Sequence, residues 1–245
     1  MERLKILLKH FLFIPAIVIA QGNDIDSTSS FDTTKSNNAH IEQKTYNLFN
    51  YQPAEDIRLI YDSDFGETTS KIVHTEDGYL VFNENNDFHY IQSLKYEDDG
   101  IYLLKADQEV DLFLFLSKEI ETLYPTPALQ MPKFLTVGQE WNWEGYKVED
   151  DDSIKVKTIG KVIGEESVTV PAGTFDALKI RYKIETSEGE HSVIDQWIVK
   201  GIGRVKLHVD MDGNGFIGTI LSILGYDEIE FTLKEIKYAE LVDKY

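Results

Sequence analysis

The sequence contains no cysteine, and this absence excludes disulfide bonds, thiolate-ligated metal sites and cysteine nucleophiles. It also has no Gly-x-Ser-x-Gly motif, and its six histidines include no His-x-x-x-His pair of the kind that binds catalytic zinc. Aspartate and glutamate are too abundant for their spacing to support or exclude a glycosidase pair. We therefore identify no catalytic residues, predict that the protein is not an enzyme, and expect the hydrophobic core alone to hold the fold.

Basic residues are also scarce, with 24 Lys and Arg against 43 Asp and Glu, and the net charge is −19. Such a surface repels nucleic acid and anionic headgroups at long range. We expect no nucleic-acid partner, and the acidity is explained as well by solubility as by binding.

The first twenty residues have the features of a secretory signal peptide. Arg3, Lys5 and Lys9 precede the apolar run Phe11–Ala20, and Val18-Ile19-Ala20 offers a cleavage site. The run is shorter than the roughly 20 residues that span a membrane, although an uncleaved N-terminal anchor is the alternative. The sequence predicts a periplasmic or secreted protein with no transmembrane segment after cleavage.

The rest of the chain divides by composition. Residues 21–45 are rich in Ser, Thr, Asn and Asp, with few apolar side chains, and predict a flexible polar tether. Residues 46–245 have the apolar content of one β-rich domain.

Apolar residues in that domain alternate with a period of two, as Ile57, Leu59 and Tyr61 illustrate. The pairs Asp77-Gly78 and Asp99-Gly100 predict tight hairpins, because Asp-Gly supplies positive φ angles. Tyr124–Pro132 reads as a proline-broken crossing, and Leu112–Leu123 and Phe216–Leu224 fit a helix or a buried strand equally well. The predicted strands are Lys71–Thr75, Tyr79–Asn83, Phe88–Tyr96, Ile101–Ala106, Val110–Leu116, Glu140–Val148, Lys155–Ile163, Ser167–Val170, Thr174–Glu185, His191–Val199, Arg204–Val209 and Glu228–Glu240.

About a dozen strands in one chain predict an all-β, mainly antiparallel fold, as a single curled sheet, a barrel or a sandwich. Pro171-Ala172-Gly173 predicts a tight corner between two of the strands, because proline lacks an N–H and glycine tolerates unusual backbone angles.

Three segments resemble the signature of a family of exported bacterial proteins of unknown function. They are Leu135–Trp141 (LTVGQEW), Val170–Leu178 (VPAGTFDAL) and Trp197–Lys206 (WIVKGIGRVK), so the resemblance covers residues 135–206. It implies a fold similar to lipoprotein carriers of the LolA type, an open half-barrel made of one curled antiparallel sheet. It implies no known reaction.

Trp141 and Trp143 are the predicted ligand-binding residues. Being two apart, they share one face of a strand, while Glu140, Asn142 and Glu144 lie on the other. Such a pair can line an apolar groove, and the alternative is that both rings belong to the core.

The segment Asp210–Gly215 has the spacing of a calcium loop. Asp210, Asp212 and Asn214 occupy the first three ligand positions and Gly215 the turn position, but Leu221 stands where the bidentate Glu belongs. The prediction is at most a weak calcium site, with no other cofactor. A polar hairpin turn is the alternative.

Two functional hypotheses follow. The first is an exported, non-catalytic protein that binds an apolar small molecule, a lipid or a protein segment on its concave face. The second is a structural or assembly component of the bacterial cell envelope, to which the tether gives reach.

Overall fold

The computed structural model describes residues 44–51, 53, 57–64, 66–76, 78–86, 88–113, 116–213 and 228–238. The predicted signal peptide and all of the predicted tether except Lys44 and Thr45 lie outside these residues. The elements are β1 (Thr45–Asn47), η1 (Leu48–Tyr51), β2 (Ile57–Ser63), β3 (Gly66–Thr75), β4 (Gly78–Glu84), β5 (Phe88–Glu97), β6 (Gly100–Phe113), β7 (Leu116–Pro132), β8 (Phe134–Thr136), β9 (Glu140–Glu149), β10 (Asp152–Val170), β11 (Gly173–Thr186), β12 (Glu190–Val199), β13 (Gly203–Gly213) and β14 (Glu228–Tyr238).

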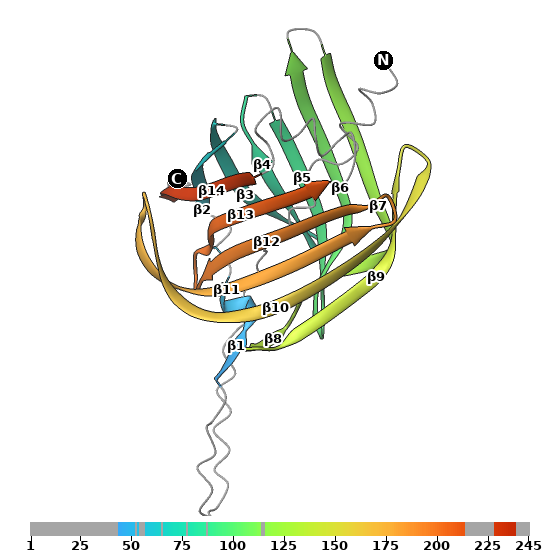
Figure 1. Cartoon of the computed structure of the whole chain (residues 1–245). Helices are drawn as coiled ribbons and strands as arrows, with labels where there is room; N and C mark the ends of the chain where they lie inside the picture. The colour runs from blue at the N-terminus through green and yellow to red at the C-terminus, as the bar shows by residue number, and fades with distance from the viewer. Residues whose placement is uncertain are drawn as a thin grey trace, which may run out of the picture.

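Twelve of these strands form one antiparallel sheet that closes into a barrel (Figure 1). The strand order is β10-β11-β12-β13-β14-β2-β3-β4-β5-β6-β7-β9, and β1 pairs with β8 outside the barrel. The prediction of one antiparallel, curled all-β sheet is confirmed. Where the family resemblance implies an open sheet, pairing of β7 with β9 completes the ring.

The contact between β7 and β9, which we call the seam, is short. Its ladder consists of two residue pairs, Thr122 with Glu149 and Leu123 with Val148. The other neighbouring pairs of barrel strands share at least five residue pairs each. The seam is therefore the shortest ladder between neighbouring strands of the described barrel.

The predicted break at Tyr124–Pro132 is wrong, because this stretch belongs to β7. Its register opposite β6 is irregular, since Leu103 pairs with Ala128 and Lys105 pairs with Leu123. Proline is tolerated at such irregularities and along an edge that lacks ladder bonds. Pro125 and Pro127 fall where β7 has passed its two paired residues with β9.

Three further boundaries differ from the predictions. Val110–Leu116 is no strand of its own, because β6 continues to Phe113 and β7 starts at Leu116. The helix alternative for Leu112–Leu123 is wrong for the same reason, and Phe216–Leu224 lies outside the described residues. Lys155–Ile163 and Ser167–Val170 form one strand, β10, with a register shift between Val162 and Gly164.

The hairpin predictions are confirmed, but the positive φ angles expected at the Asp-Gly glycines are not found. Val170 pairs with Gly173 around Pro171-Ala172, and Gly78 and Gly100 each open the second strand of a hairpin. Gly78 and Gly100 do not have positive φ angles. A Cβ at Gly78 would collide with the carbonyl oxygen of Leu94, so glycine is needed there for close approach of the backbone.

One end of the barrel is covered by η1 with β1 and β8, at the bottom of Figure 1. Leu48 and Leu135 are fully buried there, and the amide of Leu48 donates to the carbonyl oxygen of Lys133 at 2.8 Å. Gly201 donates to the carbonyl oxygen of Asn50 at 2.9 Å. We call this covered end the floor. Leu135 and Gly201, which belong to the segments of the family resemblance, therefore help to cover this end of the barrel.

Candidate ligand site inside the barrel

Trp141 and Trp143 both point into the barrel, each with 8% of its surface exposed. Glu140, Asn142 and Glu144 are exposed on the outer face, so the predicted strand register is confirmed. The role of the two rings in ligand binding stays a prediction.

Each of these indoles lies against a glycine. The Trp141 ring covers Gly160 of β10, its cross-strand partner, and the Trp143 ring covers Gly145 of its own strand. A Cβ at either glycine would collide with the indole. Trp141 also meets Tyr182 edge-on at 5.7 Å between ring centroids, and Trp143 meets Tyr124 at 5.9 Å. Such pairs stabilise the packing beyond the area that they bury.

The interior is polar along one side of the barrel. On β4, β5 and β6, Asn83, Tyr90 and Gln108 lie directly opposite one another across the strands. The adjacent row places Gln92 opposite Ala106, Ala106 opposite Thr122, and Thr122 opposite Glu149. We call these buried residues the polar wall: Thr68, Ser70, Asn83, Tyr90, Gln92, Gln108, Thr122, Lys147 and Glu149.

The opposite side of the interior is mainly apolar. Thr158, Gln196 and Arg204 are its buried polar exceptions: Gln196 donates to the Tyr182 hydroxyl at 2.9 Å, and the Arg204 guanidinium lies over the Tyr61 ring, 6.0 Å from the centroid. The remaining buried residues on β10 to β14, which we call the apolar wall, include Ile154, Val156, Ile184, Ile194, Val209 and Ile229. The two walls give the barrel interior an amphipathic character.

A buried ion pair lies on the polar wall at the seam. Lys147 Nζ is 3.0 Å from Glu149 Oε1, and the Thr122 hydroxyl donates to the same oxygen at 2.7 Å across the seam. The side chains of Lys147 and Glu149 are 11% and 5% exposed. Burial, together with nearby Tyr90 and Glu149, raises the pKa of Tyr124 well above its ordinary value.

Several buried polar atoms around the two walls have no hydrogen-bond partner among the described residues. They include Asn83 Nδ2, Gln108 Nε2, Trp143 Nε1, Glu149 Oε2 and Thr158 Oγ1. Leaving one buried polar group unpaired costs about 1–3 kcal/mol. Five such groups would therefore cancel much of the 5–15 kcal/mol that stabilises an ordinary domain. Buried polar groups in proteins are ordinarily satisfied by ordered water or by a ligand.

The calcium prediction falls partly on a strand. Asp210 and Asp212 belong to β13 and pair with Val193 and His191 of β12, while Asn214 lies outside the described residues. Within the part of the chain that the structure describes, no three acidic or histidine side chains are grouped for a metal ion. The calcium site stays a prediction.

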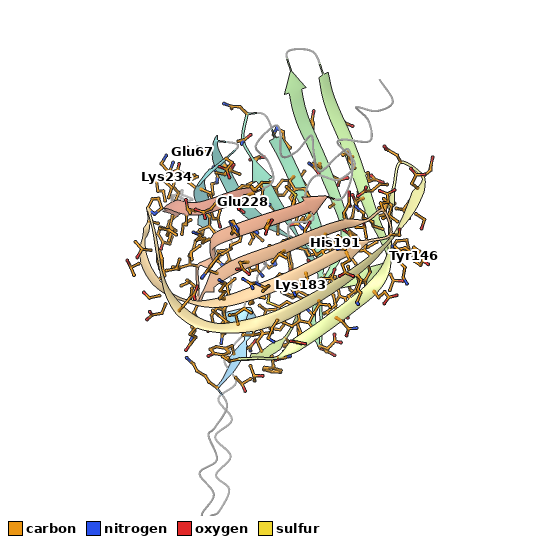
Figure 2. The ribbon with its side chains drawn as sticks, viewed as in Figure 1. Glu67, Tyr146, Lys183, His191, Glu228 and Lys234 are labelled. Atoms are coloured by element: carbon orange, nitrogen blue, oxygen red, sulfur yellow. The ribbon has the colours of Figure 1, made fainter. Side chains whose placement is uncertain are left out.

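A cluster of charged side chains around Trp197 on the outer face was not predicted from the sequence. Trp197 faces outward on β12 yet is buried, because Lys179 and Lys206 lie over its ring at 4.4 and 5.5 Å from the centroid. Its indole N–H donates to Glu166. On the same face Arg181 forms two 2.6 Å hydrogen bonds to Asp195. Lys183 of β11 and His191 of β12, labelled in Figure 2, are exposed on the same outer face of these two strands.

The polar wall was also missed, although the sequence holds a signal for it. Thr68 and Ser70, like Tyr90 and Gln92, are two apart, which places each pair on one face of its strand. Because most of the neighbouring positions are also polar, and Ile91 between Tyr90 and Gln92 is apolar, alternation alone does not show which face is buried. The cross-strand register supplies that information.

Comparisons with known proteins agree with the region of resemblance. A DUF3108-like family model matches residues 127–215. A candidate lipoprotein of Parabacteroides distasonis ATCC 8503 is 14% identical, with a TM-score of 0.36, over 76% of this chain and 98% of that chain. A candidate exported protein of Bacteroides fragilis NCTC 9343, with a YmcC-like fold, is 10% identical, with a TM-score of 0.30, over 76% of this chain and 97% of that chain. Comparison with curated proteins gives no match.

No helix in the described part of the chain is long and apolar enough to cross a membrane. The chain is thus similar, over residues 127–215, to the DUF3108-like family.

Proposed function

We propose that this chain is an exported, non-catalytic binding protein that takes up an amphipathic small molecule or lipid inside its barrel. The observation that carries the proposal is the two-sided interior. A polar wall with unpaired hydrogen-bonding atoms faces an apolar wall of aliphatic side chains. A molecule with a polar head and an apolar tail satisfies both walls at once.

Export is the part of the proposal that rests on the N-terminal sequence. The basic residues, the apolar run and the small residues at the end of it fit a signal peptide. The absence of cysteine is compatible with export, because the buried residues of the barrel form one continuous core.

Uptake requires the two walls to separate, since the side chains that form them are buried. The seam supports this step. Two ladder pairs join β7 to β9, so this connection opens at lower cost than the longer ladders around the rest of the barrel.

The proposal is tested with the protein expressed behind its own signal peptide and purified from the exported fraction. We expect native mass spectrometry and solvent extraction to detect a bound amphipathic molecule, and the stripped protein to take up a hydrophobic fluorescent dye. The variant Asn83→Leu with Gln108→Leu makes the polar wall apolar and should lose the native molecule while remaining folded.

Glu109→Gln is the matched control, because Glu109 is exposed on β6 beside Gln108. It should bind as the unaltered protein does. Purified protein with no bound molecule and no dye uptake would refute the proposal. Recovery of a specific envelope protein by crosslinking in that case would favour the structural or assembly role.

A further inference from the structure

We infer that the Lys147–Glu149 pair recognises the polar head of the ligand, and that this head is a neutral group bearing hydroxyls. The inference rests on the proposed function, because it assigns the ligand class of the same interior site. Glu149 Oε2 accepts a hydrogen bond from a ligand hydroxyl, and Lys147 keeps the site electrically balanced.

The pair lies at the end of the barrel away from the floor. Glu149 is the last residue of β9 before the Asp150-Asp151 turn, whose φ angles are 48° and 71°. Its partner Thr122 on β7 lies opposite Ala106 of β6, whereas Pro132, next to Lys133 at the floor, lies opposite Gly100, and these six positions of β6 correspond to about 20 Å of strand. A ligand whose head contacts Glu149 therefore directs its tail toward the apolar interior and the floor.

The two oxygens of Glu149 differ in their bonding. Oε1 accepts from Thr122 and is paired with Lys147, whereas Oε2 is buried with no hydrogen-bond partner among the described residues. A carboxylate oxygen is an acceptor only, so the group that satisfies Oε2 must be a donor.

Charge decides which kind of donor fits. The negative charge of Glu149 is already balanced by Lys147, so a cationic head would leave a buried excess positive charge. An anionic head brings no donor and would repel Oε2. A neutral hydroxyl donates without adding charge, and sugar or glycerol heads carry several hydroxyls.

A neighbouring donor extends the same site. Gln108 pairs with Ile120, which is two residues from Thr122 on the same face of β7, and Gln108 Nε2 is also unpaired. A head with two hydroxyls can donate to Glu149 Oε2 and accept from Gln108 Nε2. A head with a single hydrogen-bonding function satisfies one of these atoms and leaves the other unpaired.

The experiment measures displacement of the fluorescent dye from the mature protein by four probes with ten-carbon chains. They are decyl glucoside, monodecanoylglycerol, decanoate and decylammonium, each below its micelle concentration. We expect the two neutral probes to bind at least about tenfold more tightly than either ion, since a hydrogen bond to a charged group is involved. The sugar and glycerol arms separate glycolipids from acylglycerols.

Glu149→Gln replaces the acceptor Oε2 with an N–H donor. We expect this variant to lose about tenfold in affinity for the neutral probes and to gain affinity for decanoate. Glu119→Gln is the matched control, because it removes the same charge from an exposed position on β7. Thr122→Val keeps both charges and should weaken binding of the neutral probes relative to the unaltered protein, although less than Glu149→Gln does. This variant provides a second readout if Glu149→Gln folds poorly.

The outcomes separate the two proposals. Dye uptake with equal affinity for all four probes would overturn the head-group assignment and leave the binding function standing. An unchanged probe order in Glu149→Gln, or undiminished binding of the neutral probes by Thr122→Val, would do the same. Failure of the unaltered protein to take up dye or any probe would overturn both.

Discussion

The indole N–H of Trp141 on β9 donates to the backbone carbonyl of Gln130 on β7 at 3.1 Å. This bond crosses the seam beyond its two ladder pairs, so a side chain takes the place of a strand-to-strand hydrogen bond. Gln130 is buried, so without the indole its carbonyl would lose a hydrogen bond in the interior. Trp141 thus contributes to joining β7 to β9 and to closing the barrel.

We expect Trp141→Phe to destabilise the protein by about 1–3 kcal/mol, because it removes this hydrogen bond and leaves space beside Gly160. Gly160→Ala should also destabilise it, since the new methyl group collides with the indole. The double variant should be more stable than the sum of the two effects predicts. Urea unfolding of all four proteins measures the coupling, and strict additivity would argue against the contact.

The seam can be locked from outside with a disulfide, because the chain has no cysteine of its own. Leu123→Cys with Val148→Cys places two cysteines at directly opposed positions, and Leu123 is exposed. The disulfide should stabilise the protein by about 3 kcal/mol and slow dye uptake until it is reduced.

Lys157→Cys with Glu185→Cys is the control, because this pair lies on the outer face of the continuous β10–β11 ladder. Its oxidised form should take up dye at the rate of the reduced form. Equal uptake by the oxidised and reduced seam variants would show that the seam does not open for ligand.

The Asp195 cluster should make stability depend on pH. Burial acts to raise the pKa of Asp195, but hydrogen bonds from Arg181 and Lys179 outweigh it and lower the pKa below 3.8. A lowered folded-state pKa stabilises the protein above the unfolded value, and this stabilisation is lost as the pH falls through the folded value.

We therefore expect Asp195→Asn to be less stable than the unaltered protein by about 1–3 kcal/mol at pH 7. The difference should shrink as the pH drops below 4, as urea titrations at pH 7 and pH 3 would record. Asp176→Asn, at an exposed position on β11, serves as the control. A difference that stays constant with pH would contradict the assignment.

Lys147→Met should destabilise the protein by about 3–5 kcal/mol, because it leaves the buried charge of Glu149 without its partner. Adding Glu149→Gln to this variant should recover part of the loss. Lys155→Met breaks an exposed pair with Glu144 and should change stability far less than Lys147→Met does, because solvent screens exposed charges. Thermal and urea unfolding measure these differences, and equal effects of Lys147→Met and Lys155→Met would count against a buried pair.

Calcium binding at Asp210 and Asp212 is tested by calorimetry of the mature protein. A weak calcium site there predicts a small binding heat at millimolar calcium that disappears in Asp210→Ala with Asp212→Ala. No heat and no rise in melting temperature would refute the site.

The sequence by itself determined the strands, their hairpins and the faces of the aromatic residues. A period of two needs no knowledge of the partners, so Trp141 and Trp143 could be assigned to one face and Pro171-Ala172 to a turn. The same local rules failed at Tyr124–Pro132, where prolines indicated a break. There β7 continues because the irregular register tolerates residues without an N–H, and the Trp141 indole N–H donates to the carbonyl of Gln130.

Only the tertiary structure decided how the sheet closes and which polar residues are buried together. Glu149 and Thr122 are 27 residues apart, and nothing in the local pattern of either strand specifies that they meet at the seam. Closure brings them within 2.7 Å because β9 returns to pair with β7, and it buries the polar wall opposite the apolar one. Strand periodicity is a local property of the backbone, whereas the chemistry of the barrel interior depends on long-range register.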